Sequence, residues 1–270
     1  MSMDDVTTRG LVLLGCGKMG SAMLKGWLEG GLPASSVTVI APRPSDWVKS
    51  TGVNINTALP TNPAVVLLAV KPQKMAEALP ALQALGNGST VFLSVAAGLT
   101  LANYEAMLGA DTPIVRAMPN TPAAVGRGIT GIVGNAAVSA AQMDLADTLL
   151  QAVGQVVRLE NEGQMRALTA VSGCGPAYVF HLIETMAAAG EKAGLSADLA
   201  LQLARTTVAG AGHLAENSEE TPTQLRINVT SPNGVTAEAL RVLMSETDGF
   251  PPLLDRAIQA AMARDAELGQ

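Results

Sequence analysis

The chain has 270 residues, of which 48% are hydrophobic and 15% charged, and its formal net charge is −6. This length allows one large domain or two modest ones, and the apolar content is enough for a packed core. The acidic balance argues against a nucleic-acid-binding surface, and no apolar run reaches the roughly 20 residues of a membrane-spanning helix. Two isolated cysteines and no visible export signal indicate reduced thiols, so we expect a soluble cytoplasmic protein.

The first 160 residues alternate short apolar runs with helical patterns. Apolar runs predict strands at 10–15, 36–41, 64–70, 89–96, 112–118, 128–134 and 155–160. Helical spacing of apolar residues predicts helices at 18–31, 101–108 and 140–154. Near-continuous apolar strands that alternate with helices are typical of α/β proteins, so we predict a Rossmann-type, doubly wound, mostly parallel sheet.

Beyond residue 160 the strand signals stop. Ala-rich and Leu-rich segments predict helices at 162–194, 196–217, 236–246 and 251–268, the first with a glycine-rich break in its middle. We therefore place a dinucleotide-binding domain at 1–160 and an all-helical domain at 161–270. Small residues lie on several faces of these helices, and a helix that is apolar all round has to be covered. We expect the helical domain to form the interface of a homodimer.

Three glycines follow the first predicted strand in the segment "LGCGKMG". Gly15, Gly17 and Gly20 have G-x-G-x-x-G spacing between a strand and a helix, the context in which this pattern indicates dinucleotide binding. Gly15 would make the tight turn, Gly17 would let the backbone approach a pyrophosphate, and Gly20 would let the helix pack on the strand. Unpaired amides at the helix start would face the phosphates. A glycine-rich turn without a ligand is the plainer alternative.

The end of the second predicted strand, "VIAPRPS", bears on the choice of coenzyme. An acidic residue here would hold the ribose 2′-hydroxyl of NAD, and none is present. Arg43 stands there instead, and an arginine suits a 2′-phosphate. We therefore predict NADPH as the preferred cofactor, ahead of NADH. An ordinary solvated charge is the alternative for Arg43.

Other strand ends carry segments suited to a binding site. In "AVKPQ", Pro72 disfavours helical geometry at Lys71, so the chain should leave this strand as a loop. Lys71 could then reach the cofactor or the substrate. The segments 94–100 and 116–123 leave their strands with small residues and with a rigid Pro-Asn-Thr-Pro turn, respectively. Open α/β sheets bind ligands at this carboxyl edge.

The helical half is interrupted by "INVTSPNGVTAEAL", residues 227–240. Pro232 and Gly234 disfavour a helix interior, yet a helix restarts near Thr236. The start of a helix offers unpaired amides and the positive end of its dipole. From the residues alone, the segment is equally well a plain turn between helices or a cradle for a small anion.

Together these motifs resemble pyrroline-5-carboxylate reductase. The matching stretches over residues 15–240 are "GCGKMG", "AVKPQ", "SVAAG", "RAMPNTPA", "SGCGPAYVF" and "TSPNGVTAEAL". The resemblance implies reduction of the C=N bond of Δ1-pyrroline-5-carboxylate by NADPH or NADH to L-proline, the last step of proline biosynthesis. It also implies a Rossmann domain followed by a helical domain that interleaves with a partner subunit. Larger rings of dimers, often homodecamers, occur in the family.

The resemblance further implies roles for individual residues. The cofactor would contact Gly15, Cys16, Gly17, Lys18, Met19, Gly20, Asn56, Ala69, Val70, Lys71, Pro72 and Ala97. The small imino-acid substrate would contact Glu162, Asn228, Ser231, Gly234, Val235 and Thr236. As catalytic groups, Thr236 would hydrogen-bond the ring nitrogen and Glu219 would lie close to it. With this resemblance, we predict that residues 231–236 form the substrate cradle.

Two positions depart from the usual family pattern. Asn233 stands where the loop usually has glycine, and Lys18 stands where asparagine is common. Asparagine tolerates left-handed backbone better than most residues, so we expect the loop to keep its shape. Lys18 would add a positive charge beside the pyrophosphate.

Two other functions fit part of the sequence. One is a related reductase that acts on another imine or on a β-hydroxy acid. The other is a non-catalytic dinucleotide-binding regulator, which should have lost Glu219 or the loop at 231–236, and neither is lost. His181 and His213 lack nearby Cys or Asp at metal-ligand spacing, so we predict no metal site.

Overall fold

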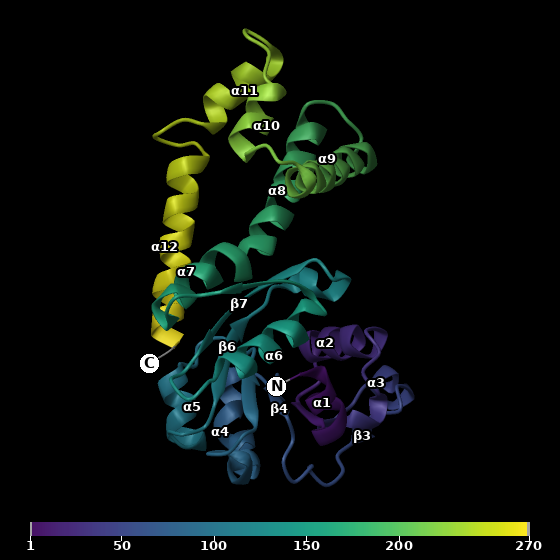
Figure 1. Cartoon of the computed structure of the whole chain (residues 1–270). Helices are drawn as coiled ribbons and strands as arrows, with labels where there is room; N and C mark the ends of the chain where they lie inside the picture. The colour runs from purple at the N-terminus through teal and green to yellow at the C-terminus, as the bar shows by residue number, and fades with distance from the viewer. Residues whose placement is uncertain (1, 269–270) are drawn as a thin grey trace. The chain divides into compact units, whose positions relative to one another are not determined.

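A computed structural model describes residues 2–268 (Figure 1). Within them the chain forms two compact units. The first contains the residues up to Gly173 and those from Met262 onward, and the second is Cys174–Ala261. The domain boundary expected after residue 160 stays a prediction.

The first unit is built on an eight-stranded sheet with the order β3-β2-β1-β4-β5-β6-β7-β8. Neighbouring strands are parallel except β6 and β7, which are antiparallel. The strands are β1 (Leu11–Leu14), β2 (Val37–Ile40), β3 (Asn54–Ile55), β4 (Val65–Leu68), β5 (Val91–Ser94), β6 (Ile114–Met118), β7 (Gly128–Gly134) and β8 (Gly154–Arg158). The predicted mostly parallel sheet is confirmed, and each predicted strand is found. Only the two-residue β3 was not expected.

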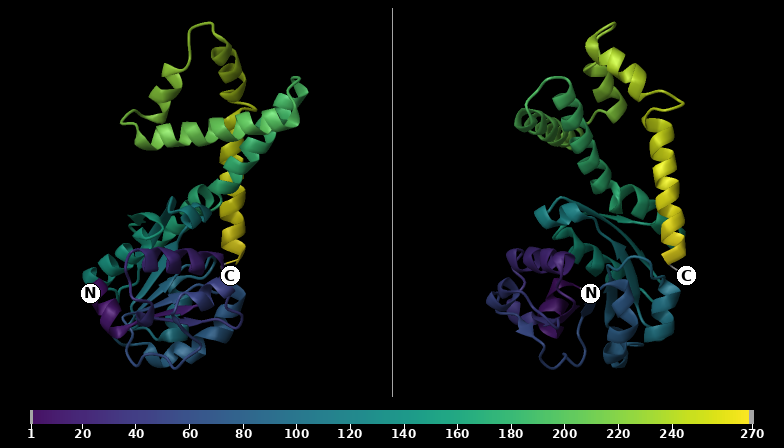
Figure 2. Two further views of the ribbon diagram at one scale, coloured as in Figure 1. Left: turned by 90° about the vertical axis from the view of Figure 1, so that its right-hand side faces the viewer. Right: turned by 180° about the vertical axis from the view of Figure 1, so that it is seen from behind.

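Helices cover both faces of this sheet (Figure 2). One face packs against α1 (Met3–Arg9), α2 (Lys18–Glu29), α3 (Asp46–Ser50) and α6 (Ala140–Gln151). The other packs against α4 (Met75–Ala78), η3 (Leu79–Leu85) and α5 (Leu101–Leu108). Successive strand residues point to opposite faces, so Leu13 joins Trp27 in one core while Leu14 joins Tyr104 in the other. Burial on both faces explains why the strands are near-continuous apolar runs.

The parallel strands place several loops at one edge of the sheet. The carboxyl ends of β1, β4, β5 and β6 lead into Gly15, Ala69, Val95 and Pro119 respectively. Since the four strands run in the same direction, these exits share the edge at which open α/β sheets bind ligands. The fold therefore gathers at one edge the four segments predicted from the sequence to carry a binding site: the glycine turn, 69–73, 94–100 and 116–123.

The chain beyond β8 is helical, as predicted. Its elements are η5 (Glu162–Gln164), α7 (Met165–Leu168), a π-helical turn (Thr169–Gly173), α8 (Gly175–Lys192), α9 (Ala197–Asn217), α10 (Pro222–Asn228), α11 (Val235–Leu243) and α12 (Phe250–Leu268). The expected glycine-rich break falls between the π-helical turn and α8. Ser196 caps α9, because its side chain accepts a hydrogen bond from the Leu199 amide. The short helices α1, α3, α4 and α10 were not expected.

The second unit buries little apolar surface within the single chain. Its buried hydrophobic side chains are Ala187, Ala200 and Ala204, where α8 packs on α9. Many large apolar side chains remain exposed, among them Phe180, Leu199, Leu203, Leu214, Val242 and Leu253. Within residues 2–268, no helix combines the length and apolar character needed to cross a bilayer.

Candidate active site

Gly15 ends β1 in a turn that only glycine fits. Its φ is +89°, and a Cβ there would lie 2.7 Å from Val70 and 2.9 Å from the carbonyl of Ala69. A Cβ on Gly20, in the first turn of α2, would lie 2.6 Å from the Gly15 carbonyl oxygen. Both glycines therefore allow the start of α2 and the loop after β4 to approach the end of β1 closely.

Gly17 has a different role, because its missing side chain faces open space. Among the described residues, no atom lies within 4 Å of a Cβ built there. Gly17 is the N-cap of α2, where this part of the chain provides neither a side-chain cap nor an acidic residue in the first turn. The amides and the positive end of α2 are therefore available to an anion.

A cleft of about 700 Å³ opens beside this turn. Its walls come from the ends of β1, β2 and β4 and from α4 and η3, and they include the predicted cofactor residues Gly15, Gly17, Ala69, Val70 and Lys71. Most of the lining is apolar, as suits a planar base. Lys71 and Lys74 bring positive charge, and the ammonium of Lys74, 2.9 Å from Glu77, lowers the pKa of that carboxyl.

A smaller cavity of about 400 Å³ lies at the amino ends of β1 and β2. Hydroxyl and amide side chains line much of it, including Thr7, Ser36 and Asn54. Ligands of open α/β sheets bind beyond the carboxyl ends of the strands. We therefore place the candidate site in the larger cleft.

The exit from β4 has the geometry that Pro72 predicts. Lys71 is extended, with φ −62° and ψ 145°, and Pro72 opens the short helix η2 (Pro72–Lys74). Because the chain turns away at Pro72, Lys71 stays exposed at the rim of the cleft.

Asn56 shapes the end of β2. Its φ is +51°. Its side chain accepts from the Ala41 amide and donates to the Ala41 carbonyl, both at 2.9 Å. The two bonds hold the backbone that leads from β2 to the exposed Arg43. The structure thus shows Asn56 supporting the turn beside the cleft, where Pro42 forms part of the wall.

The other predicted residues of the glycine loop differ in exposure. Lys18 is exposed, whereas Met19 packs against the core between the sheet and α2. Cys16 is half-buried, with its Sγ 3.4 Å from the hydroxyl of Ser21. Burial raises the pKa of the Cys16 thiol, so the thiol stays neutral near pH 7.

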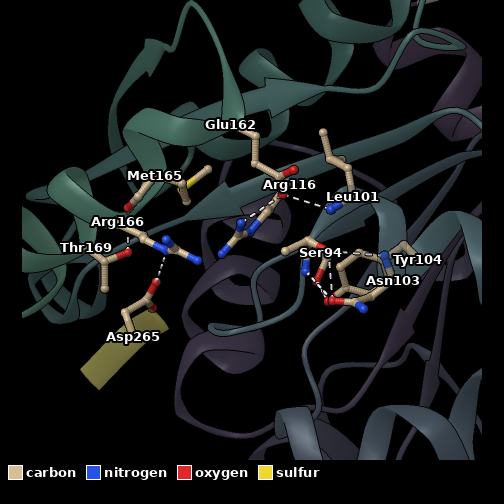
Figure 3. Close-up of polar contacts among 11 residues, drawn as sticks. Ser94, Leu101, Asn103, Tyr104, Arg116, Glu162, Met165, Arg166, Thr169 and Asp265 are labelled. Atoms are coloured by element: carbon tan, nitrogen blue, oxygen red, sulfur yellow. Dashed lines mark hydrogen bonds and ion pairs between the residues drawn. The ribbon is translucent and has the colours of Figure 1, made fainter. Parts of the chain in front are cut away.

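The loop between β5 and α5 carries Ala97. Where this loop enters α5, the carboxylate of Glu162 contacts both the Leu101 amide and the side chain of Arg116 (Figure 3). Glu162 Oε1 accepts hydrogen bonds from the Leu101 amide and from Arg116 Nη1, each at 2.8 Å. Arg116 lies on β6 and is 4% exposed. The sequence analysis missed Arg116, although a charge inside the apolar strand "TPIVRAM" signals a buried partner.

In the second unit, the turn before α11 keeps the expected left-handed asparagine. Asn233 has φ +56°, which confirms the loop shape expected at this departure from glycine. Gly234 is the N-cap of α11, and its amide donates to the Ser231 carbonyl at 3.0 Å. No side chain of the described residues caps this helix. Its first amides, with exposed Ser231 and Thr236 beside them, are therefore open to a ligand.

Asn228 is held in place by the carboxylate of Glu220. Its Nδ2 donates to Glu220 Oε2 at 2.8 Å, and its Oδ1 accepts from Gln224 Nε2 at the same distance. Glu219, the predicted catalytic acid, is exposed next to Glu220. Glu220 therefore orients one predicted substrate residue.

The structure brings the predicted residues together in two groups. Gly15, Gly17 and the loop after β4 line the cleft of the first unit. Glu162 belongs to the same unit but is not among the residues that line the cleft. The remaining predicted substrate and catalytic residues belong to the second unit: Glu219, Asn228, Ser231, Gly234, Val235 and Thr236. No group of three potential metal-binding side chains is found in the described part of the chain.

Comparisons with known proteins match the two parts of the chain to different family models. Residues 162–268 match the family model described as pyrroline-5-carboxylate reductase dimerisation, and residues 10–98 match the one described as NADP oxidoreductase, coenzyme F420-dependent. The chain is 40% identical to pyrroline-5-carboxylate reductase of Pseudomonas aeruginosa over 98% of both chains. It is 35% identical to that of Pisum sativum over 98% of this chain and 97% of the other.

The chain belongs to the pyrroline-5-carboxylate reductase family. The resemblance deduced from the motifs is confirmed. As a member of this family the protein is an oxidoreductase that uses a pyridine nucleotide, and its helical part is of an oligomerising type.

Solved structures of the family have the same fold. A pyrroline-5-carboxylate reductase from Coxiella burnetii has a TM-score of 0.91 at 34% identity and covers 97% of this chain and 99% of its own. The Plasmodium falciparum enzyme with NADP bound has a TM-score of 0.82 at 28% identity, covering 98% of this chain and 99% of its own. These matches extend over both the dinucleotide-binding and the helical parts.

Proposed function

We propose that this protein reduces 1-pyrroline-5-carboxylate to L-proline with a reduced nicotinamide dinucleotide, as the final step of proline biosynthesis. The observation that carries the proposal is the match to the Pseudomonas aeruginosa reductase over 98% of both chains. A match of that extent includes the glycine turn, the cleft beside it and the loop at 231–236. A fold alone would not carry the function, because one fold hosts many activities.

The residues of the first unit fit a dinucleotide. Gly17 leaves space where a side chain would stand, and α2 presents uncapped amides to a pyrophosphate. Gly15, Cys16, Gly17, Lys18, Met19 and Gly20 would hold the phosphates, and Ala69, Val70, Lys71, Pro72 and Ala97 would line the remainder. When bound, the reduced nicotinamide supplies the hydride.

NADPH is the proposed coenzyme, with NADH the weaker alternative. Arg43 is exposed two residues beyond Ala41, in the turn that Asn56 holds. Residues 41–45 contain no carboxylate that would repel a 2′-phosphate. An Arg43→Ser variant should lose affinity for NADPH about 10-fold and leave NADH affinity nearly unchanged, because a charge-assisted contact to phosphate contributes about 1.5–3 kcal/mol.

The start of α11 is proposed to hold the substrate carboxylate. Uncapped amides at Val235 and Thr236 and the hydroxyl of Ser231 would bind it, and Gly234 would let it approach the backbone. Asn228, oriented by Glu220, would hold the ring from its side. Glu162, the remaining predicted substrate residue, lies in the first unit, where its carboxylate accepts from the Leu101 amide and from Arg116.

The protein's part in the chemistry is to favour the protonated imine. Charge on the ring nitrogen draws electrons from the C=N bond, so the carbon accepts hydride more readily while the nitrogen keeps the proton. Exposed Glu219 would stabilise this cation electrostatically. Thr236 would orient the N–H as a hydrogen-bond partner, because a hydroxyl is a weak acid.

The working form is proposed to be a homodimer through α8–α12, with a homodecamer as a possible larger assembly of dimers. The support is the exposed apolar surface of these helices together with their match to the dimerisation family model. Both cysteines are free thiols, which suits the cytoplasm as the proposed location.

The experiment that tests the function is the oxidation of NADPH and of NADH with 1-pyrroline-5-carboxylate, compared with a six-membered cyclic imine carboxylate. We expect turnover with the five-membered ring at a kcat/KM at least about 100-fold higher, because the cradle fixes the ring and its carboxylate together. Coenzyme binding without turnover of either imine would contradict the proposal and favour a regulatory protein.

A further inference from the structure

The loop between β5 and α5, residues 95–100, is tethered at both ends. At its start, the Ser94 hydroxyl is hydrogen-bonded to the buried Tyr104 hydroxyl and accepts from the Ala96 amide at 3.3 Å. At its end, Thr100 and Asn103 form a capping box that opens α5. Within the loop, Gly98 has φ +84°. The backbone around Ala97 is therefore held in one shape.

Glu162 adds a tether from a distant part of the sequence. Its Oε1 accepts from the Leu101 amide, the first of α5, 61 residues earlier in the chain. That amide is one of those that a helix leaves without an intrahelical partner, and a carboxylate there also faces the positive end of the helix. Glu162 thereby fixes the point at which the loop becomes α5.

Arg116 holds the same Glu162 oxygen from the other side. It pairs with Ser94 in the register of β5 and β6, so both side chains lie on the face that α5 covers. The Arg116 side chain is only 5% exposed, and its Nε has no hydrogen-bond partner in the described structure. Such a guanidinium depends on its single carboxylate partner.

A purely stabilising role explains this arrangement poorly. Removing the Arg116 charge and most of the Glu162 side chain, which is 29% exposed, from water costs about as much as their attraction returns, so apolar side chains of similar volume would serve stability as well. A charged pair does, however, fix the position of the start of α5, because Nη1 of Arg116 and the Leu101 amide both donate to the same Glu162 oxygen (Figure 3).

We propose that Arg116 and Glu162 are a positioning pair that presets residues 95–100 to receive the nicotinamide half of the cofactor. The inference rests on the proposed function, in which Ala97 lines the cofactor site beyond the phosphates, and the small residues Ala96, Ala97 and Gly98 leave room there for a flat ring. Glu162 then acts on the reaction through the loop, and the distance and angle of hydride transfer depend on it. An error of about 1 Å in such placement can cost about 100-fold in rate.

The test uses the full-length protein and the variants Glu162→Gln, Arg116→Lys and the double variant. Matched controls are Asp147→Asn and Arg158→Lys, because Arg158 and Asp147 form an ion pair at 2.9 Å between β8 and α6. For each protein we would measure kcat, both KM values, the Kd of NADPH, and amide hydrogen exchange over residues 95–101.

A positioning pair should change turnover more than binding. We expect each single variant to lower kcat about 10-fold or more while the KM for the imino acid changes less than about 3-fold. The double variant should be no slower than the singles, because the two residues act as one unit. Exchange at 95–101 should accelerate about 10-fold or more without ligand, and the controls should match the wild type.

Four results would overturn the inference. A raised imino-acid KM with unchanged kcat and exchange would make Glu162 a direct substrate contact. Unchanged kinetics with faster exchange would make the pair structural only. If Glu162→Gln does not fold, Thr100→Ala loosens the same loop at its cap, and unchanged turnover in that folded variant would also refute the role.

If the wild type does not turn over 1-pyrroline-5-carboxylate, the proposed function fails, but hydrogen exchange measured with and without NADPH still tests the positioning pair. Weaker protection of the loop by NADPH in Glu162→Gln than in the wild type would support the pair. Equal protection in the two proteins would refute it.

Discussion

The two units of this protein bury their apolar residues differently. The first covers both faces of its sheet with its own helices, so that residues such as Leu13, Leu67 and Phe92 are fully buried. The second buries three alanines between α8 and α9 and leaves side chains such as Phe180 and Leu203 in contact with solvent. Contiguous exposed apolar surface marks an interface, whereas scattered single residues do not. The first unit therefore supplies its own core, and the second needs another subunit.

The largest effect should follow from charging the exposed face of α9. Leu199 and Leu203 are one helical turn apart and are 43% and 48% exposed. Burying a leucine contributes about 1.5–3 kcal/mol, so Leu199→Asp with Leu203→Asp should weaken the dimer more than about 100-fold. Sedimentation would show monomers and activity would be lost. Trp47→Gln, an exposed apolar residue of the first unit, should leave the mass unchanged. A stable dimer of the double variant would remove α9 from the interface.

The next largest effect distinguishes Gly15, which the fold requires, from Gly17, which the proposed cofactor site requires. Gly15→Ala places a methyl group 2.7–2.9 Å from the loop after β4, at φ +89°, so the free energy of unfolding should fall by about 2–4 kcal/mol. Gly17→Ala meets no described atom, so stability should change by less than about 0.5 kcal/mol. Its methyl group would occupy the proposed pyrophosphate position and raise the Kd of NADPH about 10-fold or more. Denaturant unfolding and NADPH fluorescence measure the two quantities. Equal stabilities would contradict the steric account.

A smaller effect tests the second unit without disturbing its interface. Thr236 is exposed at the start of α11, so Thr236→Ala should fold and dimerise normally. The loss of one hydrogen bond to the ring nitrogen should lower kcat about 10-fold, and Thr236→Ser should restore most of it. Steady-state kinetics with saturating NADPH would show this. Full activity in the alanine variant would exclude Thr236 from the mechanism.

The smallest effect concerns alkaline pH and the first unit alone. Burial raises the pKa of Cys16 above its ordinary value of 9.0. Above that pH the unfolded chain loses the proton first, so the free energy of unfolding falls as pH rises from 9 through the folded-state pKa. Cys16→Ser lacks this contribution. Unfolding curves at pH 8 and pH 10 should show a smaller decline for the variant; equal declines would mean that the thiol is not desolvated.

Much of the fold could be predicted from local patterns. Apolar strands buried on both faces are recognisable as continuous runs, and Pro72, Ser196 and Asn233 act through the backbone next to them. The geometry expected at Pro72 and at Asn233 is observed. The elements that were not predicted have a common cause. The short helices α1, α3, α4 and α10 and the short strand β3 lack a strong periodic pattern, and their existence depends on what they pack against.

In the candidate site, too, some features could be predicted from local patterns and others could not. Gly15, Gly17 and Gly20 could be assigned from spacing, since the steric limits on a glycine turn are local. The support given by Asn56 to the end of β2, and by Glu220 to Asn228, could not be read from spacing alone. Hydrogen bonds between side chains depend on where the folded backbone places each group.

The sequence by itself determined the order of strands and helices, the glycine turn and the membership of a reductase family, because these depend on residue type and short-range spacing. Only the tertiary structure decided that Glu162 meets both Arg116 and the start of α5, residues 46 and 61 positions away. Only it showed that the helices of the second unit leave their apolar faces uncovered. Both depend on long-range packing, in which the free energy of burying a side chain is set by neighbours that the chain brings together only when it folds.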